Sequence, residues 1–322
     1  MDDRLIQDYR RDPDPKFARE LRERLRRQDG PLHSPAVRRV LAAACAVAVV
    51  VAVFAIPSVR VSAESFLELF RVRRFAAVPF KQSRMETLRA MGEKRELLVF
   101  DRKEEVRDPG PPRYVASREA ASSEAGFAVS VPSYLPEGLA TDSTFVQGAG
   151  EVKFSISEEK LRSLLQQLDV TDVQVPKGLD GRWIEVRKPP VVVQNFRSPQ
   201  NQNRRAALIQ AKSPEVSVPA GWDVERLAEI GLRVLGLDGG EARRIARATD
   251  WRSTLLVPIP MNASTFRQVT VHGQPGLLIT TTANGADRRA SRVLLWSEGD
   301  RVFCIQGTLN GPDTMQMAES VS

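Results

Sequence analysis

The chain has 322 residues, 27% of them charged, and a formal net charge of +7 at pH 7. Its two cysteines and two histidines exclude a disulfide framework and a cysteine-based metal site. The basic excess lies in residues 1–39 and 60–118, while the remaining chain is nearly neutral. No nucleic-acid motif accompanies that excess, so we do not expect nucleic-acid binding.

Residues 1–39 predict a short cytoplasmic head with one amphipathic helix. Phe17, Leu21 and Leu25 recur at four-residue spacing, which places them on one helical face. Gly30 ends the pattern. Two interpretations stay open: a docking helix for a cytoplasmic protein partner, or a helix that lies on the inner leaflet. Under the first, Phe17, Leu21 and Leu25 are the partner-binding residues.

The next segment predicts a single transmembrane helix over residues 40–59. Val40 to Ile56 is a run of 17 residues without a charge. It would span roughly 26 Å as a helix, and about 17 residues is the minimum for a bilayer core. The apolar region of a signal peptide is shorter, about 7 to 15 residues. Cleavage near Ala63 and a buried core helix remain the alternatives.

The predicted orientation in the membrane depends more on the length of the chain after the apolar run than on the charges that flank the run. Arginines flank the apolar run on both sides, so the positive-inside rule barely discriminates. Long domains translocate largely regardless of charge. We therefore expect a single-pass protein of the cell membrane, with its N-terminus cytoplasmic and its C-terminal domain extracytoplasmic.

Residues 60–113 predict a basic juxtamembrane helical segment followed by a linker. Aromatic residues and arginines alternate there at helical spacing. The segment is interpreted either as a membrane-surface helix or as the first helix of the folded domain. The membrane-surface residues predicted from this pattern are Phe66, Phe70, Arg71, Arg73 and Arg74. A further helix is expected over Ser83–Met91, and a turn or linker over Asp108–Arg113.

Residues 114–322 predict an extracytoplasmic α+β domain with antiparallel sheet(s) and helices on one face. Alternating apolar residues favour five late strands. These are Thr254–Ile259, Thr265–Val271, Gly276–Thr281, Ser291–Trp296 and Arg301–Thr308. Helices are expected at 117–125, 158–168, 224–237, 239–248 and 311–322. A strand is expected in 127–131, and a hairpin around Gly148 joins Ser143–Gln147 to Glu151–Ile156.

No catalytic motif emerges from the chain. His33 precedes the apolar run and His272 lies at a predicted turn, so they cannot form a zinc site with cysteines. Neither a phosphate-binding glycine loop nor a nucleophile elbow is present. We therefore expect no enzymatic activity, cofactor or metal. The four tryptophans would fill a core or line an apolar groove.

Five short motifs carry a resemblance to a known group of proteins. They are Ala125–Phe127, Pro132–Pro136, Trp296–Gly299, Gly307–Leu309 and Ala318–Ser320. As a set they resemble the extracytoplasmic domains of bacterial single-pass membrane proteins of the anti-sigma-factor-like or unknown-function type. More distantly, they are similar to periplasmic sensor domains related to lipoprotein carriers. The head has no Cys-x-x-Cys of the zinc-type anti-sigma heads, so the resemblance implies the architecture more than sigma binding.

These observations together indicate a non-catalytic, membrane-anchored envelope sensor or regulator, anti-sigma-like in layout. Its expected partners are the membrane, a cytoplasmic protein such as a sigma factor, and an unidentified extracytoplasmic ligand. One alternative is an anchored lipid- or peptide-binding carrier without signalling. Another is an envelope enzyme with an unrecognised site.

Overall fold

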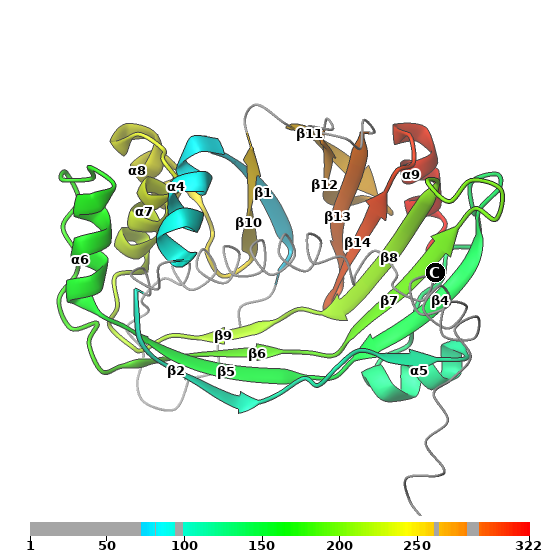
Figure 1. Ribbon diagram of the computed structural model, residues 1–322, viewed down its shortest axis with the longest axis horizontal. Helices are drawn as coiled ribbons and strands as arrows, with labels where there is room; N and C mark the ends of the chain where they lie inside the picture. The colour runs from blue at the N-terminus through cyan, green and yellow to red at the C-terminus, as the bar shows by residue number, and fades with distance from the viewer. Residues whose placement is uncertain (1–71, 81, 94–98, 261–263, 282–289) are drawn as a thin grey trace, which may run out of the picture. The chain divides into compact units, whose positions relative to one another are not determined.

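The computed structural model describes residues 72–80, 82–93, 99–260, 264–281 and 290–322 (Figure 1). The early strands are β1 (Arg74–Phe80), β2 (Phe100–Arg107), β3 (Arg113–Val115), β4 (Ala140–Gln147), β5 (Gly150–Ile156), β6 (Trp183–Lys188) and β7 (Val191–Arg197). The late strands are β8 (Arg205–Lys212), β9 (Glu215–Ser217), β10 (Thr254–Pro260), β11 (Ser264–Val271), β12 (Gln274–Thr281), β13 (Ser291–Glu298) and β14 (Arg301–Gly307). The helices are α4 (Gln82–Glu93), α5 (Arg118–Ala125), α6 (Glu158–Gln167), α7 (Val224–Val234), α8 (Gly239–Ala248) and α9 (Gly311–Glu319).

The α+β class predicted from the sequence is confirmed. An eight-stranded sheet has the order β11-β12-β13-β14-β8-β7-β4-β3, and a four-stranded sheet has the order β2-β5-β6-β9. Every pair within these two sheets is antiparallel. The remaining two strands, β1 and β10, pair in parallel. All five late strands and the five expected helices are present, with boundaries within a few residues of those predicted.

Four stretches of chain each contribute one strand to the four-stranded sheet and one strand to the eight-stranded sheet (Figure 1). They are β2–β3, β4–β5, β6–β7 and β8–β9. Each segment is interrupted where it passes from one sheet to the other. The interruptions lie at 108–112, 148–149, 189–190 and 213–214. Three of them contain proline, which cannot donate to a ladder. We call this line of interruptions the seam.

The hairpin expected around Gly148 is wrong. Strand β4 pairs with β3 and β7, whereas β5 pairs with β2 and β6, so β4 and β5 follow each other without pairing. Neither Gly148 nor Gly150 has a positive φ, as a tight hairpin turn would require. The glycine at 148 instead allows a close approach, because a Cβ there would lie 2.9 Å from the Pro109 carbonyl oxygen.

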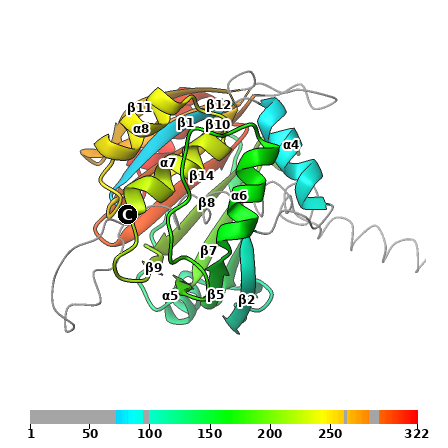
Figure 2. The same cartoon turned by 90° about the vertical axis from the view of Figure 1, so that its left-hand side faces the viewer.

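The first hydrophobic core lies between the four-stranded sheet and three helices, α4, α6 and α7 (Figure 2). Its sheet side comprises Phe154, Ile156, Ile184, Val186 and Val216, which alternate with polar residues along β5, β6 and β9. Its helical side comprises Leu161, Leu164, Leu165, Leu227 and Ile230. Residues of β12 and of the β1–β10 pair complete this core.

The second core covers the opposite face of the eight-stranded sheet, under α9. Trp296, Phe303 and Ile305 are fully buried there, and Met317 and Ala318 of α9 pack against the same cluster. A smaller cluster places α5 over Val146 and Val192. Val192 of this smaller cluster and Phe196 of the second core lie four residues apart on β7, so α5 and α9 cover the same face of this sheet. On the other face, Leu277 and Ile279 of β12 belong to the first core. Strand β12 buries four consecutive residues, Gly276–Ile279, so both faces of the sheet need cover.

Within the described residues, no helix has the length and apolar character needed to cross a membrane. The predicted head (1–39) and transmembrane segment (40–59) lie outside the described residues. The described part of the segment predicted as 60–113 contributes β1, α4, β2 and the first residue of β3. Its strands pair with strands of the later chain, which was predicted as the separate domain 114–322.

Candidate functional site

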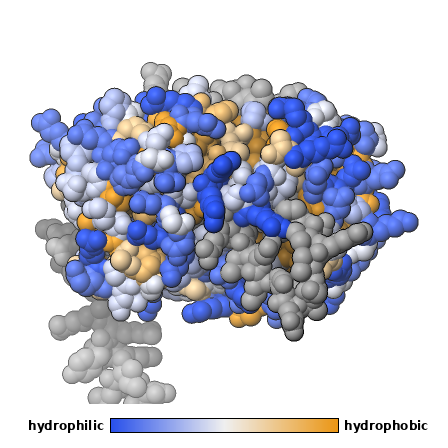
Figure 3. Space-filling view, turned by 180° about the vertical axis from the view of Figure 1, so that it is seen from behind, coloured by the Kyte–Doolittle hydropathy of each residue, from blue (hydrophilic) through white to orange (hydrophobic). Residues whose placement is uncertain are grey.

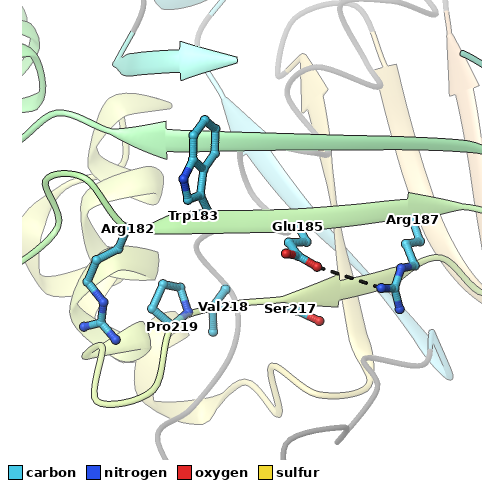
Figure 4. Close-up of a pocket in the computed structure, with 7 residues that line it drawn as sticks. All are labelled: Arg182, Trp183, Glu185, Arg187, Ser217, Val218 and Pro219. Atoms are coloured by element: carbon cyan, nitrogen blue, oxygen red, sulfur yellow. Dashed lines mark ion pairs between the residues drawn. The ribbon is translucent and has the colours of Figure 1, made fainter. Parts of the chain in front are cut away.

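An open hollow of about 490 Å³ lies on the outer face of the four-stranded sheet (Figure 4). Strand β6 supplies three of its residues, Trp183, Glu185 and Arg187, at alternate positions. Their neighbours Ile184 and Val186 point the other way, into the first core. The rest of the lining is Arg182, Ser217, Val218 and Pro219.

Charged side chains form a cross-strand network beside this hollow. Lys153 Nζ lies 2.8 Å from Glu185 Oε1, and Arg187 lies within 4 Å of Glu151, Glu185 and Glu215. The hydrogen bond to Glu185 raises the pKa of Lys153. These residues are opposite one another in the register of β5, β6 and β9, which explains the pairing.

The hollow offers recognition chemistry and no evident reaction chemistry. Its aromatic wall is Trp183, half-buried, with the Arg102 guanidinium 5.3 Å from the ring centroid. Its carboxylate, Glu185, is engaged by two cations. An aromatic ring between fixed charges favours a polar ligand with one apolar side. Seen from the side opposite to Figure 1, the surface of the described residues is mostly polar, with small scattered apolar groups (Figure 3).

A second feature concerns the chain that follows the predicted transmembrane segment. The Val72 amide donates to Ser213 Oγ at 2.7 Å, directly at the seam. The Arg73 and Arg74 amides donate to the Ser253 carbonyl at 2.8 and 3.0 Å. The Ser297 hydroxyl in turn donates to the Arg73 carbonyl at 2.9 Å. The first described residues are thus fixed to three separate parts of the domain.

Arg73 and Arg74 therefore lie in a different element from the one predicted. Arg74 opens strand β1 and Arg73 directly precedes it, so neither belongs to a basic helix. Val72, Phe75 and Phe80 are buried, which explains why this stretch pairs with β10. The other predicted membrane-surface residues, Phe66, Phe70 and Arg71, lie outside the described residues, as do Phe17, Leu21 and Leu25.

The motifs that carried the resemblance meet around the second core. Residues 127–131 form no strand of the sheets, although one was expected there. Instead, the Val131 amide donates to the Ser322 carbonyl at 2.9 Å, and the Ser133 amide donates to the Ser320 carbonyl at 2.9 Å. Tyr134 donates from its amide to Ser320 Oγ at 3.1 Å. The Tyr-Leu-Pro motif is thus tied to the C-terminus.

A buried glutamine strengthens the same junction. Gln210 is fully buried in β8, where its side chain accepts from the Ser130 amide at 2.9 Å and donates to the Ser130 carbonyl at 2.7 Å. It also donates to Gln194 Oε1 at 3.2 Å. Sequence reasoning missed this residue, because a single glutamine in an apolar strand gives no pattern. The network serves packing of the 126–136 segment and contacts no cavity found in the described residues.

His272 occupies the hairpin turn that was predicted, but its ring is not simply solvated. The ring lies between the end of β13 and the end of α9, with Nε2 2.9 Å from the Glu319 carbonyl and Nδ1 3.2 Å from Glu298 Oε2. The hydrogen bond to the Glu319 carbonyl, followed by those to Glu298, raises the pKa of His272. A cation at the C-terminal end of α9 is also favoured by the helix dipole.

The remaining special residues are structural. Trp222, Trp251 and Trp296 are buried, so three of the four tryptophans fill cores, and only Trp183 lines a hollow. Burial raises the pKa of the Cys304 thiol to about 12, which keeps it protonated. Within the described ranges, no group of three or more His, Cys, Asp or Glu side chains is arranged to hold a metal ion.

Comparisons with family models, with curated proteins and with solved structures find no match to this chain.

Proposed function

We propose that the chain is a non-catalytic, membrane-anchored sensor or regulator of the bacterial envelope, with an anti-sigma-like layout. Residues 40–59 would cross the membrane, and the head would report to a cytoplasmic protein through Phe17, Leu21 and Leu25. The domain would bind its ligand outside, and the hollow beside Trp183 is the candidate place for it.

One observation carries the proposal: the attachment of residues 72–80. A carrier on a flexible tether needs no contact between tether and domain. Here Val72, Arg73 and Arg74 are each hydrogen-bonded into the domain, and β1 pairs along its whole length with β10. A change in the domain would therefore be passed to the chain that leads back to residues 40–59, as signalling through a single helix requires.

The carrier alternative needs an apolar groove between sheet and helices. That space contains the first core, with Leu161, Leu164 and Leu227 packed against Phe154 and Ile184. A lipid- or peptide-carrier would have to displace α6 or α7 to open it. The enzyme alternative needs a free acid–base pair in a cleft, whereas Glu185 of the hollow is ion-paired.

The topology is tested by labelling with a membrane-impermeant thiol reagent in intact cells. Single cysteines replace Ser34 in the head and the exposed Ser123 of α5, with Cys45 and Cys304 removed. Labelling at position 123 alone, with the full-length chain in the membrane fraction, supports the proposal. A shortened, soluble chain indicates cleavage near Ala63 and removes the physical link to the cytoplasm.

The reporting role of the head is tested separately. Replacing Phe17, Leu21 and Leu25 by serine should abolish capture of the cytoplasmic partner, while membrane insertion is unchanged. Replacing Arg19, Arg22 and Arg26 by glutamine is the matched control on other positions of the same predicted helix. If the variant at Phe17, Leu21 and Leu25 still captures the partner as the native chain does, the docking interpretation of the head is wrong.

A further inference from the structure

The two long exposed edges of the antiparallel sheets differ in how they are protected. Edge strand β2 carries charges at most of its positions: Asp101, Arg102, Lys103, Glu104, Glu105 and Arg107. Two register shifts also interrupt its pairing with β5. Charges and bulges of this kind prevent an edge from pairing with another chain. Edge strand β11 has an unbroken register with β12 and a single charge, Arg267.

The hairpin geometry shows which backbone groups of β11 face outward. His272 and Gly273 both have positive φ, 50° and 74°, as a two-residue type I′ turn requires. The flanking pair Val271–Gln274 is then a hydrogen-bonded pair, and hydrogen-bonded pairs recur at every second residue. The amide and carbonyl groups of Phe266, Gln268 and Thr270 therefore point away from β12.

The side chains at this edge are also open to a partner. Phe266, Gln268 and Thr270 are exposed, and Phe266 has 46% of its surface accessible, one of three large apolar side chains so exposed among the described residues. Such an edge is a template for adding a strand. An exposed, regular edge with so little charge is normally avoided in proteins that remain monomeric.

We propose that β11 pairs antiparallel with β11 of a second copy, about a two-fold axis at Gln268. In that register each Phe266 faces Thr270 of the other copy, a favourable aromatic–β-branched pair. Arg267 faces Val269 of the other copy, so no like charges oppose one another. Gln268 faces its own counterpart, and the outward backbone groups of both copies hydrogen-bond. The two eight-stranded sheets become one continuous sheet.

Other symmetric registers are worse. Centring the pair on Arg267 would bring two guanidinium groups together, and would use backbone groups that already bond to β12. Centring it on Phe266 or Thr270 shortens the overlap to part of the strand. The inference does not depend on the sensor function, since it rests on the edge alone.

Disulfide trapping of the full-length chain in detergent micelles tests this register. In a Cys45→Ala background, Gln268→Cys places two cysteines opposite each other, within the Cα separation that a disulfide accepts. We expect a disulfide-linked dimer for Gln268→Cys and at least a tenfold lower yield for two controls. The controls are Arg267→Cys on the same strand and Glu104→Cys on the protected edge β2. No dimer with Gln268→Cys, or equal yields at 267 and 268, overturns the proposal.

A proline substitution provides the second, independent arm. The Gln268 amide points outward, so Gln268→Pro removes no bond to β12 but blocks the added strand. Sedimentation of the native chain should show a concentration-dependent dimer, and Gln268→Pro should remain monomeric with an unchanged melting temperature. A chain that is monomeric throughout, or a dimer that survives Gln268→Pro, contradicts pairing through β11.

Discussion

The two antiparallel sheets share four chain segments but present very different outer surfaces. The outer face of the four-stranded sheet is a network of paired charges around a hollow, with Lys153, Glu185 and Arg187 at its centre. The corresponding surface of the eight-stranded sheet is the second core, closed by α9 and the 126–136 segment. The seam therefore separates a solvated, charged surface from a packed scaffold.

From this difference we expect that stability and ligand binding depend on different residues. Residues of the second core should control folding and leave ligand contacts untouched. Residues around the hollow should affect binding with little effect on folding. Residues at the seam, where Val72 meets Ser213, should affect the link between the two.

The sharpest comparison is between two tryptophans. Trp296 is fully buried and stacks on Phe303, with ring centroids 5.0 Å apart. We expect Trp296→Ala to lower the free energy of unfolding by about 3–5 kcal/mol. Trp183 is half-buried in the hollow, so Trp183→Ala should cost about 1 kcal/mol or less. Urea denaturation of the two variants measures this, and equal losses would contradict the division into scaffold and surface.

Two glycines allow a second comparison between the eight-stranded sheet and the seam, through the space that each leaves for a Cβ atom. A Cβ at Gly307 of β14 would lie 2.2 Å from the Arg205 carbonyl oxygen, which must move for the residue to fit. We expect Gly307→Ala to destabilise the protein by about 1–3 kcal/mol. At Gly150, beside the seam, the nearest atom is the Pro109 side chain at 3.1 Å. Gly150→Ala should therefore give the smaller fall in melting temperature, and the reverse order would show that the seam is the more tightly packed region.

The hydrogen bond between Val72 and Ser213 should contribute less to the free energy of unfolding than the packing at Trp296 and Gly307. Ser213→Ala removes the acceptor of the Val72 amide, and Val72 is 2% exposed, so its N–H would lose its partner away from water. We expect a loss of about 1 kcal/mol, with faster hydrogen exchange confined to 72–80. Ser217→Ala, in the adjoining strand β9 and lining the hollow, is the matched control and should leave that exchange unchanged. Protection of 72–80 in Ser213→Ala equal to that of the native chain would mean that the contact does not hold the strand.

The smallest expected effect is a pH dependence from His272. Because the pKa of His272 is raised in the folded state, its protonated form stabilises the fold. That contribution is fully present below the ordinary histidine pKa of about 6.5 and is lost as pH rises through the folded pKa. His272→Asn keeps a residue suited to positive φ. Its melting temperature should vary less with pH than that of the native chain. Parallel pH profiles would show that His272 contributes none of the dependence.

The sequence was informative where local patterns decide structure. The strands from Thr254 onward were predicted from alternating apolar residues, and two pairs of them are separated by the predicted turns at 272–273 and 299–300, so their positions were predicted closely. Helix starts depend on equally local signals: Ser157 and Asp223, which directly precede two of the expected helices, each accept from a backbone amide three residues later. These features depend on neighbours in the chain, which a single sequence contains.

The errors concern contacts between distant segments. Gly148 and Gly150 suggested a hairpin, but the strands on either side pair with β6 and β7, at separations of 28 to 57 residues. The stretch around Arg73 and Arg74 had helical spacing, yet Phe75 and Phe80 are buried beside β10, which lies some 180 residues later. The hollow was not predicted, because its charges pair across strands whose order the sequence does not specify.

Hydrogen exchange of the full-length chain, followed residue by residue in β1, tests the central claim most directly. If the strand after the predicted transmembrane segment is an integral part of the domain, the β1 amides that bond to β10 should exchange as slowly as the bonded amides of β10 and β12. Fast exchange in β1, with β10 and β12 protected, would show that the strand detaches in solution. The domain would then be tethered rather than coupled, and the sensor proposal would lose its physical basis.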